Sequence, residues 1–157
     1  MARQLRVAII GAGIGGLTAA ACLRRVGIDV RIYEQARSFF RLGAGIQQAP
    51  NSIRVLRALG LEPALRQLAF QPETNRSRDY DTGAVTNTQV LGAEVEARYG
   101  APYFLMHRGD LHAALAGLVP PDIIHHDHRL EGLSQRGTTV TMTFTNGARA
   151  EADAVIG

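Results

Sequence analysis

The segment with the clearest chemical potential is a glycine-rich run near the start of the chain. Gly11-Ala12-Gly13-Ile14-Gly15-Gly16 fits the pattern G-x-G-x-x-G. In that pattern Gly11 permits a tight turn, Gly13 lets backbone amides approach a pyrophosphate, and Gly16 lets a helix pack close to a sheet. The first amides of such a helix carry partial positive charge, which suits phosphate. The run therefore indicates a dinucleotide-binding loop, provided that a strand precedes it and a helix follows it.

The flanking sequence supplies that context. Arg6–Ile10 is a short apolar run typical of a buried parallel strand, and Ile14–Val26 has small and apolar residues at helical spacing before Gly27. Asp29–Glu34 alternates like a second strand. These segments predict a βαβ unit with a right-handed crossover. Glu34 ends the second strand, at about the 20-residue spacing where an acidic residue binds the ribose hydroxyls.

The rest of the chain predicts alternating strands and helices first and antiparallel strands later. We expect a loop at Gly43–Asn51, helices at Ser52–Leu59, Pro63–Ala69 and Leu111–Leu118 (with Asp110 as N-cap), a hairpin of Arg76–Tyr80 and Ala84–Val90, and strands at Tyr103–His107, Asp122–His126, Arg129–Ser134, Thr138–Thr145 and Ala148–Gly157. Asn146-Gly147 between the last two strands is a strong hairpin signal. The predicted fold class is α/β: a Rossmann-like parallel sheet with crossover helices plus an antiparallel β appendage.

Composition narrows the class of protein. Hydrophobic residues make up 46% and charged residues 20% of the 157, which is typical of a globular domain. There is no apolar run long enough to cross a bilayer and no signal-peptide pattern at the start, so we expect a cytoplasmic location and no membrane partner. All 17 basic residues are arginines, spread along the chain without dense runs. We therefore expect no nucleic-acid partner. Cys22, in an Ala-rich helical stretch, is expected to be buried.

Histidines could suggest a metal site, but their pattern does not support one. His125-His126-Asp127-His128 would place His126 and His128 on one face of a strand and His125 on the other. No further ligands follow at the spacing of a tetrahedral or octahedral site. His107 and His112 lie on either side of a predicted strand–helix junction, so a shared site is not expected either. We expect no metal.

Three further segments resemble a known family. They are Arg41-Leu42-Gly43-Ala44-Gly45-Ile46-Gln47 with Pro50-Asn51, His107-Arg108-Gly109-Asp110-Leu111, and Ala152–Gly157. Their order resembles the class A FAD-dependent aromatic hydroxylases, the p-hydroxybenzoate and salicylate hydroxylase family, and is most similar to members of the 6-hydroxynicotinate 3-monooxygenase type. The resemblance covers the whole chain. It implies that residues 1–157 are the N-terminal part of an FAD-binding domain, incomplete because it ends on the first glycine of the second FAD fingerprint.

The resemblance also implies roles for individual residues around FAD. Glu34 and Gln35 would hold the adenosine ribose. Arg41 and Arg108 would lie along the ribityl-pyrophosphate, where the fixed charge and many donors of arginine suit phosphate oxygens. Leu130 would supply backbone contacts near the adenine.

One position departs from the family pattern. Gln47 stands where the similar hydroxylases carry a histidine proposed to act on the substrate hydroxyl. Because glutamine cannot act as a general base, Gln47 keeps only a hydrogen-bonding role near flavin or substrate. This departure puts a pyridine substrate in doubt, and no catalytic residue is assigned.

The function implied by the resemblance is hydroxylation of a small hydroxylated aromatic or pyridine carboxylate, with FAD as cofactor, NADH or NADPH as reductant and O₂ as co-substrate. The chain alone is expected to be inactive. Its last strand, Ala152–Ile156, is expected to pair with a second copy in a homodimer, or else to cause aggregation. Two alternatives remain. One is a catalytically inactive, truncated nucleotide-binding fragment. The other is an NAD-dependent dehydrogenase domain, which leaves the motifs around Arg41 and Arg108 unexplained.

Overall fold

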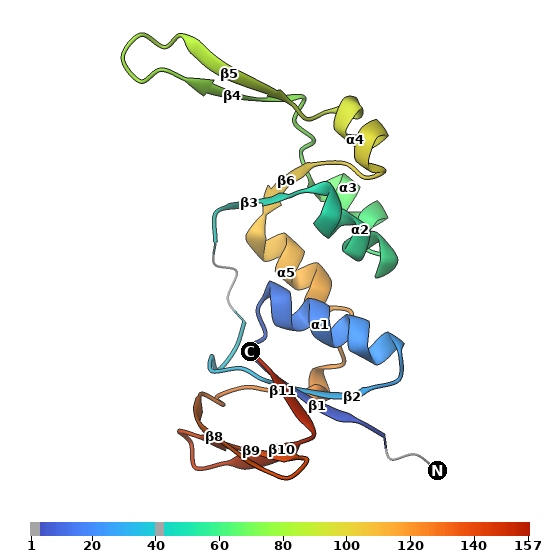
Figure 1. The fold of residues 1–157 in the computed structure, drawn as a ribbon, viewed down its shortest axis with the longest axis vertical. Coiled ribbons are helices and arrows are strands. Elements are labelled where there is room, and N and C mark those ends of the chain that lie inside the picture. The colour runs from blue at the N-terminus through green and yellow to red at the C-terminus, as the bar shows by residue number, and fades with distance from the viewer. Residues whose placement is uncertain (1–3, 40–42) are drawn as a thin grey trace. The chain divides into compact units, whose positions relative to one another are not determined.

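A computed structural model describes residues 4–39 and 43–157 of the chain. The chain forms two compact units (Figure 1). Unit 1 comprises Met1–Arg41 and His112–Gly157, and unit 2 comprises Leu42–Leu111. The boundary falls within helix α5 (Arg108–Ala116).

Unit 1 is built on a four-stranded parallel sheet with the order β11-β1-β2-β7. Its strands are β1 (Arg6–Ile10), β2 (Asp29–Tyr33), β7 (Ile124–His125) and β11 (Ala154–Ile156). Helix α1 (Ile14–Arg25) connects β1 to β2, which pair in parallel along their whole length. The predicted βαβ unit and the α/β fold class are therefore confirmed.

Two different layers cover the two faces of this sheet. Figure 1 shows α1 on one side and the antiparallel strands β8 (Leu130–Arg136), β9 (Thr139–Phe144) and β10 (Arg149–Ala152) on the other. Ile9 faces α1, because a Cβ added at Gly16 would lie 3.2 Å from its side chain. Ala8 belongs instead to a buried cluster with Met142 and Phe144 of β9. Alternation along β1 thus sends neighbouring residues into different cores.

The predicted last strand, Ala148–Gly157, is wrong in one respect, since two strands occupy it. β10 pairs antiparallel with β9, whereas β11 pairs parallel with β1. The chain changes sheets at Asp153, whose N–H donates to the Arg6 carbonyl (2.9 Å) and whose carboxylate accepts from the Arg6 N–H (2.8 Å). The hairpin turn at Asn146-Gly147 is confirmed, with Gly147 at φ 83°.

Unit 2 contains short strands and helices. Strand β3 (Gly45–Gln48) pairs antiparallel with β6 (Phe104–His107), and the hairpin of β4 (Thr74–Arg78) and β5 (Val85–Val90) is exposed along its whole length. Its helices are α2 (Pro50–Ala58), α3 (Glu62–Leu68) and α4 (Ala93–Tyr99).

Four local predictions need correction, and one helix was missed. The predicted loop Gly43–Asn51 contains β3, and α4 was not predicted. Helix α5 begins at Arg108, three residues early, so Asp110 lies in its first turn and is not an N-cap. A 3₁₀ turn, η1 (Pro121–Ile123), replaces the first residues of the predicted Asp122–His126 strand. Cys22 is exposed, whereas Leu17, Ala20 and Ala21 are the buried residues of α1. Among the described residues, no helix is long and apolar enough to cross a membrane.

A buried carboxylate connects the helices of unit 2. Glu62, at the start of α3, is 6% exposed and accepts hydrogen bonds from Arg57 of α2 and Arg66 of α3, the latter at 2.8 Å. Arg66 also donates to Glu96 of α4 at 2.5 Å. The network therefore connects three helices. The hydrogen bond from Arg57 is the main cause that lowers the pKa of Glu62.

We predict that Glu62→Gln destabilises unit 2 by about 1–2 kcal/mol, because a charge-assisted bond is lost while both guanidinium groups remain half-exposed. Hydrogen exchange of the unit 2 amides under mild urea measures this, with the exposed Glu94→Gln on α4 as the control. Since the pKa of Glu62 is lowered in the folded state, the stabilisation is complete above the unfolded pKa of about 4.3 and is lost as pH falls through the folded pKa. A difference between variant and wild type that stays constant down to pH 2 would contradict this assignment.

Candidate dinucleotide-binding site

The glycine-rich run forms the turn between β1 and α1. Gly11 has φ 100°, a left-handed conformation that glycine adopts without strain, and its N–H donates to the Tyr33 carbonyl at the end of β2 (2.8 Å). Helix α1 begins at Ile14 with Gly13 as its N-cap, and no side chain caps it. Its first turn contains no acidic residue. The positive end of the helix is thus available to an anion.

The glycines of this turn differ in the space around them. A Cβ added at Gly16 would lie 2.0 Å from the Gly11 carbonyl oxygen, so only glycine permits this approach of helix to loop. A Cβ added at Gly13 or Gly15 would meet nothing within 4 Å. Close packing of the protein therefore requires Gly16, whereas the open sides of Gly13 and Gly15 leave room for a ligand to reach the backbone.

Glu34 lies directly after β2 and connects two loops. Its Oε2 accepts from the Ala12 N–H at 2.8 Å, and its Oε1 accepts from the Ala36 N–H at 2.7 Å. Its own N–H donates to the His125 carbonyl of β7 at 2.9 Å. The carboxylate is half-buried, and the neighbouring Gln35 is exposed. Glu34 is therefore fixed beside the glycine-rich turn with lone pairs left for further donors.

The two predicted arginines cannot be placed beside these residues. Arg41 lies outside the described residues. Arg108 belongs to unit 2, where its N–H donates to the Ala44 carbonyl at 3.1 Å. The stem of Arg108 packs over Gly43, where an added Cβ would lie 3.0 Å from it. Gly43, at φ 140°, thus makes room for the Arg108 side chain.

Gln47 and Leu130 occupy different environments. Gln47 is exposed on β3, and its Oε1 accepts a hydrogen bond from the Tyr103 hydroxyl at 2.7 Å, also within unit 2. Leu130 begins β8 in unit 1 and packs against the buried cluster that includes Phe144. Its side chain therefore belongs to the core, and its backbone is the part that could contact a ligand.

The histidines are arranged differently from the strand alternation predicted for them. β7 ends at His125, and Asp127 has φ 60°, so the chain turns. The His125 ring stacks on Tyr33 at 5.0 Å, and His128 lies on the same side, 5.6 Å from Tyr33. His126 lies beside Phe39 instead. Burial, followed by the charges of His128 and Arg31, lowers the pKa of His125.

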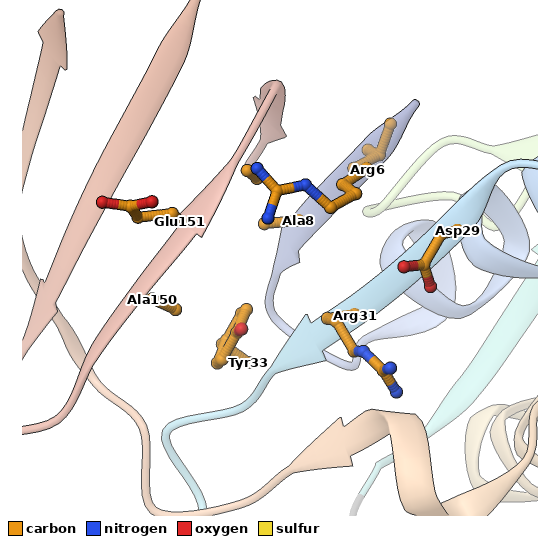
Figure 2. Close-up of a pocket in the computed structure, with 9 residues that line it drawn as sticks. Arg6, Ala8, Asp29, Arg31, Tyr33, Ala150 and Glu151 are labelled. Atoms are coloured by element: carbon orange, nitrogen blue, oxygen red, sulfur yellow. The ribbon is translucent and has the colours of Figure 1, made fainter. Parts of the chain in front are cut away.

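A cavity of about 270 Å³ lies in unit 1 between the parallel sheet and β10 (Figure 2). It is lined by Arg6, Val7, Ala8, Asp29, Arg31, Tyr33, Ala150, Glu151 and Ala152. None of these residues belongs to the glycine-rich turn, and α1 packs on the opposite face of the sheet. The cavity is therefore separate from the dinucleotide site.

Sequence reasoning missed His112, which contacts the glycine-rich turn. Its Nε2 lies 2.8 Å from the Ala12 carbonyl oxygen. The signal available in the sequence was the start of α5. A helix that begins at Arg108 contains His112 in its second turn, whereas the predicted cap at Asp110 gave no reason to include His112 in the site.

The βαβ unit, the open glycines and the fixed carboxylate at the end of β2 define a dinucleotide-binding protein of the Rossmann class. Residues 4–155 match the family described as "FAD binding domain". The chain belongs to this family.

Curated relatives and solved structures agree with this assignment. The chain is 43% identical to 6-hydroxynicotinate 3-monooxygenase of Pseudomonas fluorescens, over 100% of this chain and 41% of that protein. It is 45% identical to 3-amino-4-hydroxybenzoate 2-monooxygenase PtnB3 of Streptomyces platensis, over 97% and 38%. The fold is similar to 2,6-dihydroxypyridine-3-hydroxylase from Arthrobacter nicotinovorans, with TM-score 0.81, 30% identity and coverage of 100% and 37%. Klebsiella pneumoniae HpxO, solved with FAD and uric acid, gives TM-score 0.83, 26% identity and coverage of 96% and 38%.

The chain spans about 40% of the length of the curated relatives it matches. The resemblance to class A flavin hydroxylases is therefore confirmed for this portion.

We predict that Gly16→Ala and Gly15→Ala have different effects on stability. The new methyl group at position 16 would collide with the Gly11 carbonyl, so the variant should lose about 1–3 kcal/mol or more. At position 15 the methyl group meets open space within a helix, so alanine should be neutral or stabilise by up to about 1 kcal/mol. Thermal unfolding of both variants tests this, and equal melting temperatures would contradict the close approach at Gly16.

Proposed function

We propose that this chain is the FAD-binding portion of a flavin-dependent monooxygenase. The observation that carries the proposal is the juxtaposition of Glu34, at the end of β2, with the uncapped N-terminus of α1 and the open backbone at Gly13. A dinucleotide needs this combination: a carboxylate for ribose hydroxyls and free amides for a pyrophosphate. Membership of the FAD binding domain family supports FAD as that dinucleotide.

The residues of the chain fit FAD in the following roles. Gly11, Gly13, Ile14, Gly15 and Gly16 would surround the pyrophosphate. Glu34 would accept hydrogen bonds from the adenosine ribose, with the exposed Gln35 beside it, and the Leu130 backbone would lie near the adenine. Arg41 and Arg108 would neutralise the pyrophosphate and contact the ribityl chain.

The whole protein would hydroxylate a small hydroxylated aromatic or pyridine carboxylate. The names of the relatives, which act on hydroxynicotinate and aminohydroxybenzoate, support this class of substrate. FAD, when bound, supplies the redox and oxygen chemistry, with NADH or NADPH as reductant and O₂ as co-substrate. The residues described here bind and orient it.

Gln47 is proposed only as a hydrogen-bonding group, since the amide cannot accept a proton at neutral pH. A cytoplasmic location and a homodimer through the edge strand β11 belong to the same proposal.

An inactive nucleotide-binding fragment and an NAD-dependent dehydrogenase domain are the alternatives. Equilibrium dialysis of the 157-residue protein against FAD and against NAD separates them from the proposal, which expects preference for FAD. Preference for NAD would overturn it. Hydroxylation, seen by mass spectrometry as a product one oxygen atom heavier, is expected from a protein of the relatives' full length and not from this chain alone.

We predict that Gly13→Ala abolishes FAD binding without loss of stability. Gly13 has φ −74° and ψ −177°, a conformation that alanine adopts readily, and an added Cβ meets no protein atom within 4 Å. The same methyl group would occupy the space through which a pyrophosphate approaches the backbone. The measurements are flavin fluorescence on titration and the melting temperature without ligand. Unchanged FAD affinity would place the pyrophosphate elsewhere.

A further inference from the structure

The two residues whose N–H groups donate to Glu34 also contact histidines through their carbonyl groups, all within unit 1. The N–H of Ala12 donates to one carboxylate oxygen of Glu34, and the N–H of Ala36 donates to the other. The carbonyls of the same two residues face two histidines: the Ala12 oxygen lies 2.8 Å from His112 Nε2, and the Ala36 oxygen lies 3.1 Å from His126 Nδ1. Both loops beside Glu34 are therefore held from two sides.

Phe39 contacts both of these histidines. Its ring meets His112 edge-on at 4.8 Å and 75°, and meets His126 at 4.8 Å and 73°. Such T-shaped contacts are one of the two preferred arrangements of aromatic rings. Four segments distant in sequence are thereby connected: the glycine-rich turn, the loop after β2, helix α5 and the loop after β7. The His112 ring is held in place by its helix and by Phe39.

The hydrogen bond of His112 fixes the orientation of one peptide plane. A carbonyl oxygen only accepts, so His112 carries a proton on Nε2 when it bonds to Ala12. In a planar trans peptide, the C=O of Ala12 and the N–H of Gly13 point in opposite directions. A donor that holds the Ala12 oxygen toward α5 therefore turns the Gly13 N–H away from α5, toward the open side of the turn.

We propose that His112 is a positioning residue of the nucleotide site: its Nε2–H holds the Ala12–Gly13 peptide so that the Gly13 N–H faces the pyrophosphate. The proposal rests on the proposed binding of FAD. His112 does not touch the cofactor in this account. It acts through the Ala12–Gly13 peptide. A donor that is already oriented raises the affinity for the ligand, because it need not be ordered when the ligand binds.

Two variants at the same position separate this role from simple packing. His112→Leu removes both the ring and the donor, whereas His112→Gln removes the ring but places an amide N–H near the same position. Both variants lose the contact with Phe39, so both should lose similar stability. We expect His112→Leu to bind FAD about tenfold more weakly than wild type, as for one lost hydrogen bond, and His112→Gln to stay within about threefold.

A second readout needs no ligand. In ¹⁵N-labelled protein without FAD, the Gly13 amide resonance should shift in His112→Leu and move much less in His112→Gln. The matched controls are His128→Leu and His128→Gln. The His128 ring packs on Tyr33 and Phe144, and its Nδ1 lies 2.6 Å from the His126 carbonyl oxygen, so these variants change a neighbouring imidazole while the bond between His112 and Ala12 remains. Neither control should move the Gly13 resonance or change FAD affinity.

The outcomes distinguish this inference from the function on which it rests. If wild type binds FAD and both His112 variants bind it equally well or equally poorly, the positioning role is overturned while the proposed function stands. If wild type binds no FAD, the proposed function fails, and the Gly13 resonance still reports whether His112 holds the peptide. An unshifted Gly13 resonance in His112→Leu overturns the inference in either case.

Discussion

The nucleotide side of unit 1 depends on the Glu34 carboxylate and the two backbone N–H groups that it accepts. Ala12 is 1% exposed, so its N–H would be buried without a partner if Glu34 were absent. A buried unpaired N–H costs about 1–3 kcal/mol, which is enough to displace the turn. The carboxylate therefore supports the fold before any ligand arrives. Because an ionised carboxylate offers about four lone-pair sites, the same group can still receive ribose hydroxyls.

Sequence alone predicted the features of this site that depend on local chemistry. Gly11 has a positive φ, and Gly16 lies against a backbone oxygen, so each position excludes other residues for a reason that can be deduced from its place in the motif. Strand β1 was predicted because a buried parallel strand is a continuous apolar run, and β2 was predicted from its alternation. Glu34 was singled out by its spacing from the glycines. Each of these signals lies within about 30 residues of chain.

The features that were missed depend on contacts between distant segments. His112 meets Ala12 across 100 residues, and no local pattern marks that hydrogen bond. The change of sheets at Asp153 depends on its bonds to Arg6 in β1, so the sequence of the last strand reads as continuous. The histidines were assigned to alternate faces of a strand, but the positive φ of Asp127 ends that alternation. In each case the structure depends on contacts or turns that local propensity does not specify.

The contrast between the two units shows where this chain is already organised for binding. In unit 1, the Glu34 carboxylate accepts hydrogen bonds from Ala12 and Ala36, while Gly13 and Gly15 leave open space beside the backbone. In unit 2, the β4–β5 hairpin is exposed on both faces, and two strands alone are only marginally stable in water. Organisation without a ligand lowers the cost of binding one. In the described residues, the surroundings of Glu34 and the glycine-rich turn therefore have this organisation without a ligand.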